Sequence, residues 1–229
     1  DQESGIQMDV KQWGSEAFTE RLRKAYEEGK FSRERLSDMV RRILRSIFAV
    51  GADKREPSPE VDMSRHDEIA LEGARQGIVL LKNQDALPLA TDRPLKVAVI
   101  GGYAHKGVIS GSGSGAVAPV GGYVGHLNIG GPGTMGAARD LFLFAPSPLS
   151  ELKKLLPNAN VEFDPGYTPA EAVLMAKRSD VVIAFGIRVE GEGFDSADLS
   201  LPWGQDDVID AVASANAKTI VVLQTGNPS

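Results

Sequence analysis

Runs of apolar, largely β-branched residues alternate with helical patterns over the latter part of this chain. Three runs are predicted strands: "LKVAVIG" (95–101), "VVIAFG" (181–186) and "TIVVLQTG" (219–226). The first has the β-branched composition of a strand that is buried in a sheet. Helical patterns at 167–180 and 205–216 separate the later runs. Strands that alternate with helices form parallel sheets with helices on both faces. The sequence therefore predicts an α/β fold, and this pattern limits the possible architectures more than any other feature does.

Two further elements extend this α/β pattern. "SRHD" begins a helix expected to run from 64 to about 82, and "NVEF" (160–163) is the strand expected after 95–101. Thr168 is the expected N-cap of the next helix, because Pro169 then occupies the first helical position and Glu171 completes a capping box. Residues 64–229 would then form one α/β domain.

The first 63 residues have a different pattern. Apolar residues at helical spacing predict helices at 16–28 and 33–50, the second with Ser32 as N-cap and Gly51 as its stop. Their apolar faces lack neighbouring strands in the sequence, so we expect them to need a partner surface. "ADKREPSPEVDM" (52–63) contains two prolines among charged residues, which is typical of a linker.

Composition excludes several classes of partner. The 25 Lys and Arg against 31 Asp and Glu give a net charge of −6, so neither nucleic acid nor an anionic membrane is an expected partner. No apolar run is long enough to span a membrane. With no cysteine, the chain forms neither disulfides nor thiolate metal sites. The three histidines have no metal-ligand spacing and are expected to be capping or surface residues.

Two glycine-rich polar segments follow predicted strands. "SGSGSGAVAPVGG" (110–122) follows the strand at 95–101, and "VEGEGFDSADLSLPWGQ" (189–205) follows the strand at 181–186. Both should lie at the carboxyl edge of the sheet, where parallel sheets bind ligands. The first segment precedes no helical pattern, which argues against nucleotide binding. It is either a flexible loop or a turn in which backbone or Ser114 approaches a polyhydroxy ligand.

The second segment carries four carboxylates, Glu190, Glu192, Asp195 and Asp198. They could form a solvated acidic loop, a calcium site or a general acid/base on a flexible loop. Their spacing does not match an EF-hand loop. The residues alone leave these alternatives open.

Four stretches together resemble the family 3 glycoside hydrolases, typified by β-glucosidases. They are "RLSDMVRRILRSIFAVG", "ARQGIVLLKNQDALPL", "GVISGSGSGAVAPVGG" and the segment from "EGEGFDSADLSLPWGQ" to the end of the chain. They occur in the family's order, and the resemblance runs through almost the whole chain. The family's glycine-serine loop usually has three glycines before its serine, whereas Ser112 replaces the middle one here and Ala116 stands where glutamine is common.

The resemblance implies a retaining β-glycosidase, with a (β/α)8-like barrel followed by an (α/β)6 sandwich. In that family an aspartate on the barrel is the nucleophile and a glutamate on the sandwich is the acid/base. The motif match places the acid/base at Glu192, with Glu190 as the alternative. The expected substrate-binding residues are Gly113, Ser114, Asp195 and Trp203, although Trp203 fits a core position equally well. The resemblance implies a β-glucoside or oligosaccharide substrate, and we expect neither a cofactor nor a metal ion.

The same resemblance divides the chain into three parts. Residues 1–51 would be the end of the barrel, 52–63 a linker and 64–229 a sandwich that is incomplete at its C-terminus. We therefore expect the barrel of the same parent protein, with its nucleophile, to be the partner, as a separate chain. A secreted or periplasmic location is favoured over a cytoplasmic one. A non-catalytic module that binds sugars or stabilises a larger enzyme is the alternative function.

Overall fold

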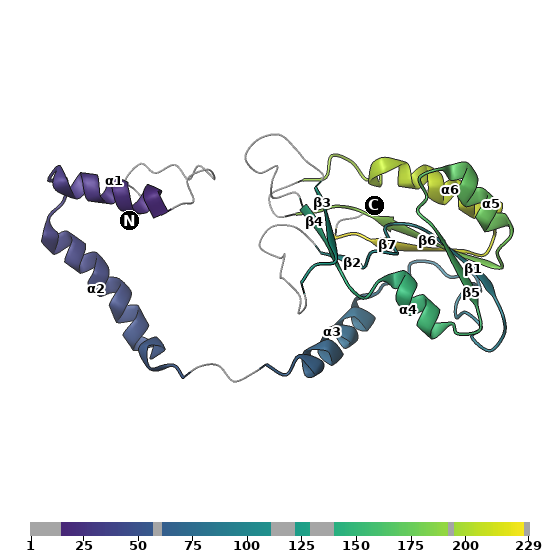
Figure 1. The fold of residues 1–229 in the computed structure, drawn as a ribbon, viewed down its shortest axis with the longest axis horizontal. Coiled ribbons are helices and arrows are strands. Elements are labelled where there is room, and N and C mark those ends of the chain that lie inside the picture. Colours follow the sequence, from purple (N-terminus) through teal and green to yellow (C-terminus); the bar gives the residue numbers. More distant parts are fainter. Residues whose placement is uncertain (1–14, 57–60, 111–121, 129–139, 192–194, 227–229) are drawn as a thin grey trace. The chain divides into compact units, whose positions relative to one another are not determined.

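The computed structural model describes residues 15–56, 61–110, 122–128, 140–191 and 195–226 (Figure 1). The chain divides into two compact units, Asp1–Leu81 and Lys82–Ser229. Three predicted site residues, Glu192, Gly113 and Ser114, lie outside the described residues.

The first unit contains the helices α1 (Ser15–Glu27), α2 (Arg33–Ala49) and α3 (Met63–Gly77), with a 3-10 turn at Ala52–Lys54. The Ser32 side chain accepts a hydrogen bond from the backbone N–H of Arg35 at 3.2 Å, which confirms the predicted N-cap of α2. Gly51 adopts a left-handed φ of 66° directly after the last turn, as a helix stop requires.

The predicted helix at 64–82 is shorter than expected and begins one residue earlier. Its N-cap is Asp62, whose carboxylate accepts hydrogen bonds from the Ser64 hydroxyl at 2.6 Å and from the Arg65 backbone at 3.3 Å. The helix ends at Gly77, and the apolar residues 78–81 that follow are not helical. Because that run is rich in β-branched and apolar residues, its periodicity alone did not distinguish helix from extended chain.

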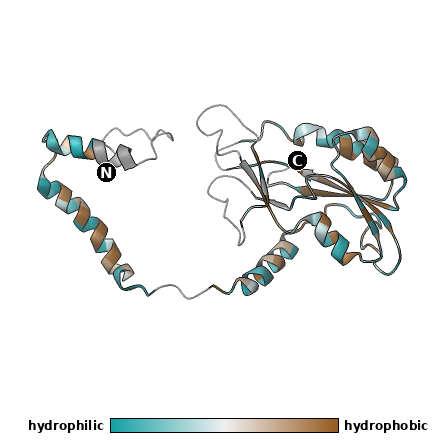
Figure 2. Ribbon diagram, in the orientation of Figure 1, coloured by the Kyte–Doolittle hydropathy of each residue, from teal (hydrophilic) through white to brown (hydrophobic). Residues whose placement is uncertain are grey.

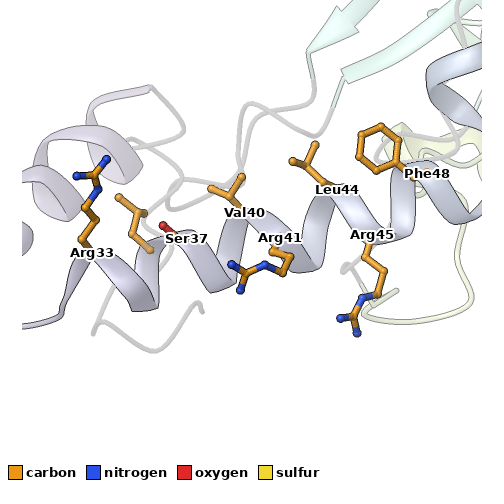
Figure 3. A pocket seen from close by; sticks show the side chains of 8 residues that line it. Arg33, Ser37, Val40, Arg41, Leu44, Arg45 and Phe48 are labelled. Carbon is orange, nitrogen blue, oxygen red and sulfur yellow. The ribbon is translucent and has the colours of Figure 1, made fainter.

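One face of α2 carries apolar side chains that no described residue covers. Figure 3 shows Val40, Leu44 and Phe48 pointing to one side of the helix, while Arg41 and Arg45 point to the other. Phe48 is 58% exposed and none of the residues of α2 is buried.

The second unit is built on a four-stranded parallel sheet with the order β5-β1-β6-β7. Its strands are β1 (Lys96–Gly101), β5 (Asn160–Asp164), β6 (Val181–Ile187) and β7 (Thr219–Gln224). In the register of the central pair, Val97 lies beside Val181. The helix α4 (Pro148–Leu155) lies on one face, and α5 (Pro169–Lys177) and α6 (Gln205–Ala215) lie on the other (Figure 1). The predicted α/β sandwich with a parallel sheet is confirmed.

The alternation of side chains along β1 builds two cores from one strand. Val97 and Val99 point into the cluster that α4 covers, while Ala98 and Ile100 point into the cluster that α5 and α6 cover. All four are at most 1% exposed. This burial on both faces explains why the strand has no polar residue after Lys96.

The capping of α5 differs from the sequence-based expectation, and α4 has a cap that was not predicted. Thr168 is the N-cap residue of α5, but its side chain makes no capping hydrogen bond, so the predicted capping box with Glu171 is wrong. The backbone carbonyl of Thr168 instead accepts the Glu171 N–H at 3.0 Å. A reciprocal capping box occurs in α4, between Ser147 and Ser150.

A second, antiparallel sheet was not predicted. It has the order β2-β4-β3, formed by β2 (Val108–Ser110), β3 (Gly125–Asn128) and β4 (Asp140–Phe144). Among the described residues, no helix is both long and apolar enough to cross a membrane.

Candidate functional site

The acidic segment follows β6 and leads into α6. Its first limb contains Arg188 to Gly191, and its second limb contains Asp195 to Gly204. Glu192 stands between the two limbs and lies outside the described residues, whereas Asp195 is described and exposed. The described limbs therefore show how the two ends of this loop are held.

Arg188 anchors the second limb to the first. Its side chain is only 8% exposed, and it is the only buried charged or polar residue found in the described parts of the chain. The guanidinium donates hydrogen bonds to the backbone carbonyls of Asp198 at 3.2 Å and Ser200 at 2.7 Å. A buried charge needs such partners, so this arginine fixes the path of the returning chain. Arg188 was not predicted, and its signal in the sequence is an arginine directly after a buried strand.

Gln205 closes the base of the loop. Its amide oxygen accepts the Ile187 N–H at 2.9 Å, and its amide nitrogen donates to the carbonyls of Ile187 at 2.7 Å and Pro202 at 2.8 Å. The Leu201 N–H also donates to Asp206 at 2.9 Å. The end of β6 and the start of α6 are thus joined by side-chain bonds. Gln205 was predicted only as the start of a helix.

Glu190 links the loop to the neighbouring strand. Its carboxylate accepts a hydrogen bond from the backbone N–H of Gly226, two residues after β7. A Cβ atom at position 226 would lie 2.5 Å from a carboxylate oxygen of Glu190, so a larger residue there would force the Glu190 side chain to shift. Glu190 therefore has a structural contact that ties the loop after β6 to the chain after β7.

Trp203 lies at the end of the second limb and is 55% exposed, so the alternative of a core position is wrong. Its ring makes an edge contact with Tyr103, with centroids 6.0 Å apart and planes at 76°. Burial raises the pKa of the Tyr103 phenol, and its contact with the Tyr167 hydroxyl raises it further. These aromatic residues lie at the carboxyl edge of the sheet, on the segments that follow β1 and β5 and precede α6.

His105 is not the simple surface residue that the sequence suggested. Its ring packs against Phe163 at a centroid distance of 4.4 Å, and its Nδ1 atom is buried without a hydrogen-bond partner. Burial lowers the pKa of His105, and the nearby Lys106 ammonium lowers it further. His66 and His126 are exposed, as expected.

No metal site is evident in the parts of the chain that the structure describes, since no three His, Asp or Glu side chains gather there.

Parallel α/β sheets bind ligands at their carboxyl edge, where the two anchored limbs of this loop lie. The family comparison identifies the kind of domain. Residues 78–229 match the model of the glycosyl hydrolase family 3 C-terminal domain. The chain belongs to glycoside hydrolase family 3.

Similar proteins are named as β-glucosidases. The chain is 30% identical to thermostable β-glucosidase B of Acetivibrio thermocellus, covering 100% of this chain and 29% of that protein. It is 34% identical to probable β-glucosidase L of Emericella nidulans, covering 94% of this chain and 31% of that protein. The chain thus spans about a third of the length of these relatives.

Solved structures show the same fold. The family 3 β-glucosidase of Bifidobacterium adolescentis matches with a TM-score of 0.61 at 27% identity, covering 91% of this chain and 29% of that chain. A β-glucosidase from Chaetomella raphigera matches with a TM-score of 0.61 at 26% identity, covering 90% and 31%.

Proposed function

We propose that this chain supplies the acid/base loop of a retaining β-glycosidase that hydrolyses terminal β-linked glucosyl residues, with Glu192 as the acid/base. The observation that carries this proposal is the family 3 membership of the chain, together with a loop held at both ends around Glu192. The names of the relatives favour a β-glucosidase.

In the proposed mechanism the carboxylic acid of Glu192 protonates the departing glycosidic oxygen, while an aspartate of the barrel attacks the anomeric carbon. Glu192, now a carboxylate, takes a proton from the water that releases the sugar from that aspartate. A fixed loop base supports this function, because a proton donor must lie within hydrogen-bond reach of its target.

The contacts of Glu190 support giving the acid/base function to Glu192. The Glu190 carboxylate already accepts the Gly226 N–H, and it lies next to the buried end of β6. We propose that Glu190 positions the loop. Asp195 and Trp203 remain proposed substrate contacts on the second limb, and Gly113 and Ser114 on the glycine-serine loop.

We further propose that residues 1–51 pack against the barrel of the same parent protein, with 52–63 as a linker. The exposed stripe of Val40, Leu44 and Phe48 supports this partner (Figure 3). Burying each such side chain is worth roughly 1.5–3 kcal/mol, so covering the stripe would stabilise the assembly.

The test is hydrolysis of aryl β-glucosides with good and poor leaving groups by the assembly of this chain with its barrel. Glu192→Ala should lower kcat/KM about 10²–10⁴-fold for a poor leaving group such as phenol. The loss of kcat/KM should be far smaller for the dinitrophenyl β-glucoside, because dinitrophenolate departs without protonation. Glu190→Gln is the matched control and should affect both substrates equally.

A loss that is independent of the leaving group in Glu192→Ala would contradict the proposed acid/base. If the loss of kcat/KM depended on the leaving group in Glu190→Gln instead, Glu190 would be the acid/base and Glu192 would position the loop. Unchanged hydrolysis of every substrate by both variants would favour the non-catalytic module.

A further inference from the structure

The carboxyl edge of the parallel sheet borders a pocket of about 430 Å³ within the second unit. Its walls come from the turn after β1 (101–105), the segment that enters α5 (165–169) and the start of α6 (203–209). Ligand pockets usually enclose about 300–1,000 Å³, so this volume suits a small molecule or one unit of a longer chain.

Three aromatic side chains line this pocket. They are Tyr103, Tyr167 and Trp203, of which Tyr167 is 72% exposed and Trp203 is 55% exposed. The edge contact between Tyr103 and Trp203 holds the indole at an angle to the phenol ring. Exposed aromatic side chains gathered in one pocket offer ring faces on which an apolar ring surface can stack.

The backbone supports a functional interpretation of the same pocket. In the described part of the chain, three residues other than glycine have a positive φ, and two of them are Tyr103 at 51° and Trp203 at 63°. Bulky side chains rarely adopt this conformation, and such outliers cluster at ligand sites, where the surrounding structure maintains them. These two are the residues whose rings contact each other across the pocket.

The polar groups of the pocket favour an uncharged ligand that donates hydrogen bonds. Asp207 and Gln205 lie at the start of α6, and His105 lies in the turn after β1. Among the described residues that line the pocket there is no lysine or arginine, which disfavours phosphate and other anions. A carboxylate beside aromatic rings suits hydroxyl groups on a ring with an apolar face.

We propose that this pocket binds one pyranose ring of an uncharged, β-linked oligosaccharide. The ring stacks on Trp203 and Tyr167, and one of its hydroxyls donates to the Asp207 carboxylate. The choice of a sugar rests on the proposed β-glycosidase function, but the proposed contacts come from Trp203, Tyr167 and Asp207, and none of them is the proposed acid/base or a residue of the barrel. It adds Tyr103, Tyr167 and Asp207 to the residues that contact carbohydrate.

The experiment uses tryptophan fluorescence of the 229-residue chain. The chain has two tryptophans, Trp13 and Trp203, so Trp13→Phe leaves Trp203 as the only reporter. Titration with cellobiose should change the Trp203 emission with a saturable dependence on concentration. Sorbitol has the hydroxyls of a sugar without a ring face and should give no saturable change. Either a flat cellobiose titration or an equal response to sorbitol would overturn the proposal.

Variants in the same background locate the site. Tyr167→Ala should raise the Kd for cellobiose about threefold to tenfold, as loss of one stacking partner does. Asp207→Asn keeps the shape of the side chain and should weaken binding by a similar factor. Tyr123→Ala removes a tyrosine that stacks on Phe142 in the antiparallel sheet, away from the pocket, and should leave the Kd unchanged. Equal weakening in Tyr123→Ala and Tyr167→Ala would also overturn the proposal.

This test is independent of the proposed catalysis. Glu192→Gln should leave the Trp203 titration unchanged even though it removes the proposed acid/base. If cellobiose binds but the loss of kcat/KM in Glu192→Ala does not depend on the leaving group, only the proposed function of Glu192 is rejected. If that loss depends on the leaving group but cellobiose does not bind, only the proposed pocket is rejected.

Discussion

The helices α2 and α6 are both amphipathic, but only α6 has a covered apolar face. In α6 Val212 is fully buried, and Val208 and Ile209 pack against the core that α5 and β6 share. In α2 the apolar residues Val40, Leu44 and Phe48 are 41–58% exposed. Figure 2 shows hydrophobic residues on both helices. The amphipathic pattern therefore specifies a helix in each case, but within its own unit only α6 has a buried apolar face.

The largest expected difference between the two regions is the effect of a buried charge. Val182 is 0% exposed in the central strand β6, so Val182→Asp should cost more than about 4 kcal/mol and unfold the sheet. Val40 is 47% exposed on α2, so Val40→Asp should change the free energy of unfolding by less than about 0.5 kcal/mol. Urea unfolding followed by circular dichroism measures both. Equal effects would show that α2 is covered within this chain.

The second prediction compares two arginines. Arg188→Met removes the charged donor to two carbonyls of the loop and should cost about 1.5–3 kcal/mol in the free energy of unfolding. Arg45→Met on α2 replaces an exposed arginine and should be neutral within about 0.5 kcal/mol. Amide hydrogen exchange at Leu201, whose N–H donates to Asp206, should accelerate only in Arg188→Met. Unchanged exchange there would mean that Arg188 does not hold the second limb.

The third prediction compares two helix caps. Ser147 accepts the Ser150 N–H at 3.1 Å, and Asp62 accepts the Arg65 N–H at 3.3 Å. Ser147→Ala should lower the free energy of unfolding of the sheet by about 1 kcal/mol, because Leu149 and Leu152 of α4 pack on its core. Asp62→Ala should reduce helix content in α3 without moving that transition. A shift of the sheet transition in Asp62→Ala would show that α3 unfolds together with the second unit.

The sequence showed the centre of the parallel sheet most clearly, because β1 and β6 are buried on both faces, whereas β5 and β7 are only partly buried. Burial on both faces selects runs such as "VAVIG" and "VVIAF", which are visible without knowledge of their partners. The helix α4 was missed because its eight residues show little helical periodicity, although Ser147 followed by Pro148 is a helix-start signal. The antiparallel sheet was missed because its three- to five-residue strands are separated by glycine-rich sequence, and short runs carry little periodicity.

The site was predictable in its motifs but not in its anchors. The loop motif places Glu192 between two strands, but the bonds from Arg188 to Ser200 and from Gln205 to Ile187 depend on how the chain returns in space. The Glu190 contact with Gly226 joins residues 36 positions apart. The pocket combines Tyr103 with Trp203, which are neighbours only because β1 and β6 are adjacent in the sheet. Such contacts follow from the strand order, which the sequence pattern did not specify.

The smallest expected effect is a pH dependence that distinguishes a partly buried histidine from an exposed one. His105 has a lowered pKa because burial disfavours the imidazolium, and its ring packs against Phe163. In the unfolded chain this imidazole has its ordinary pKa of about 6.5. Between those two pKa values the unfolded state binds more protons than the folded state. The free energy of unfolding should therefore fall as the pH drops below about 6.5, and this contribution should level off below the folded pKa.

The variant His105→Leu keeps an apolar side chain against Phe163 and removes the titrating group, so its unfolding free energy should depend less on pH between 7 and 5. The matched control is His66→Gln on α3, where the side chain is exposed and solvated in both states. That variant should keep the pH profile of the parent chain. Urea unfolding at a series of pH values measures all three proteins. The opposite result would be a weaker pH dependence of the unfolding free energy in His66→Gln and an unchanged one in His105→Leu. The protonation that destabilises the fold would then lie in the first unit and not at His105.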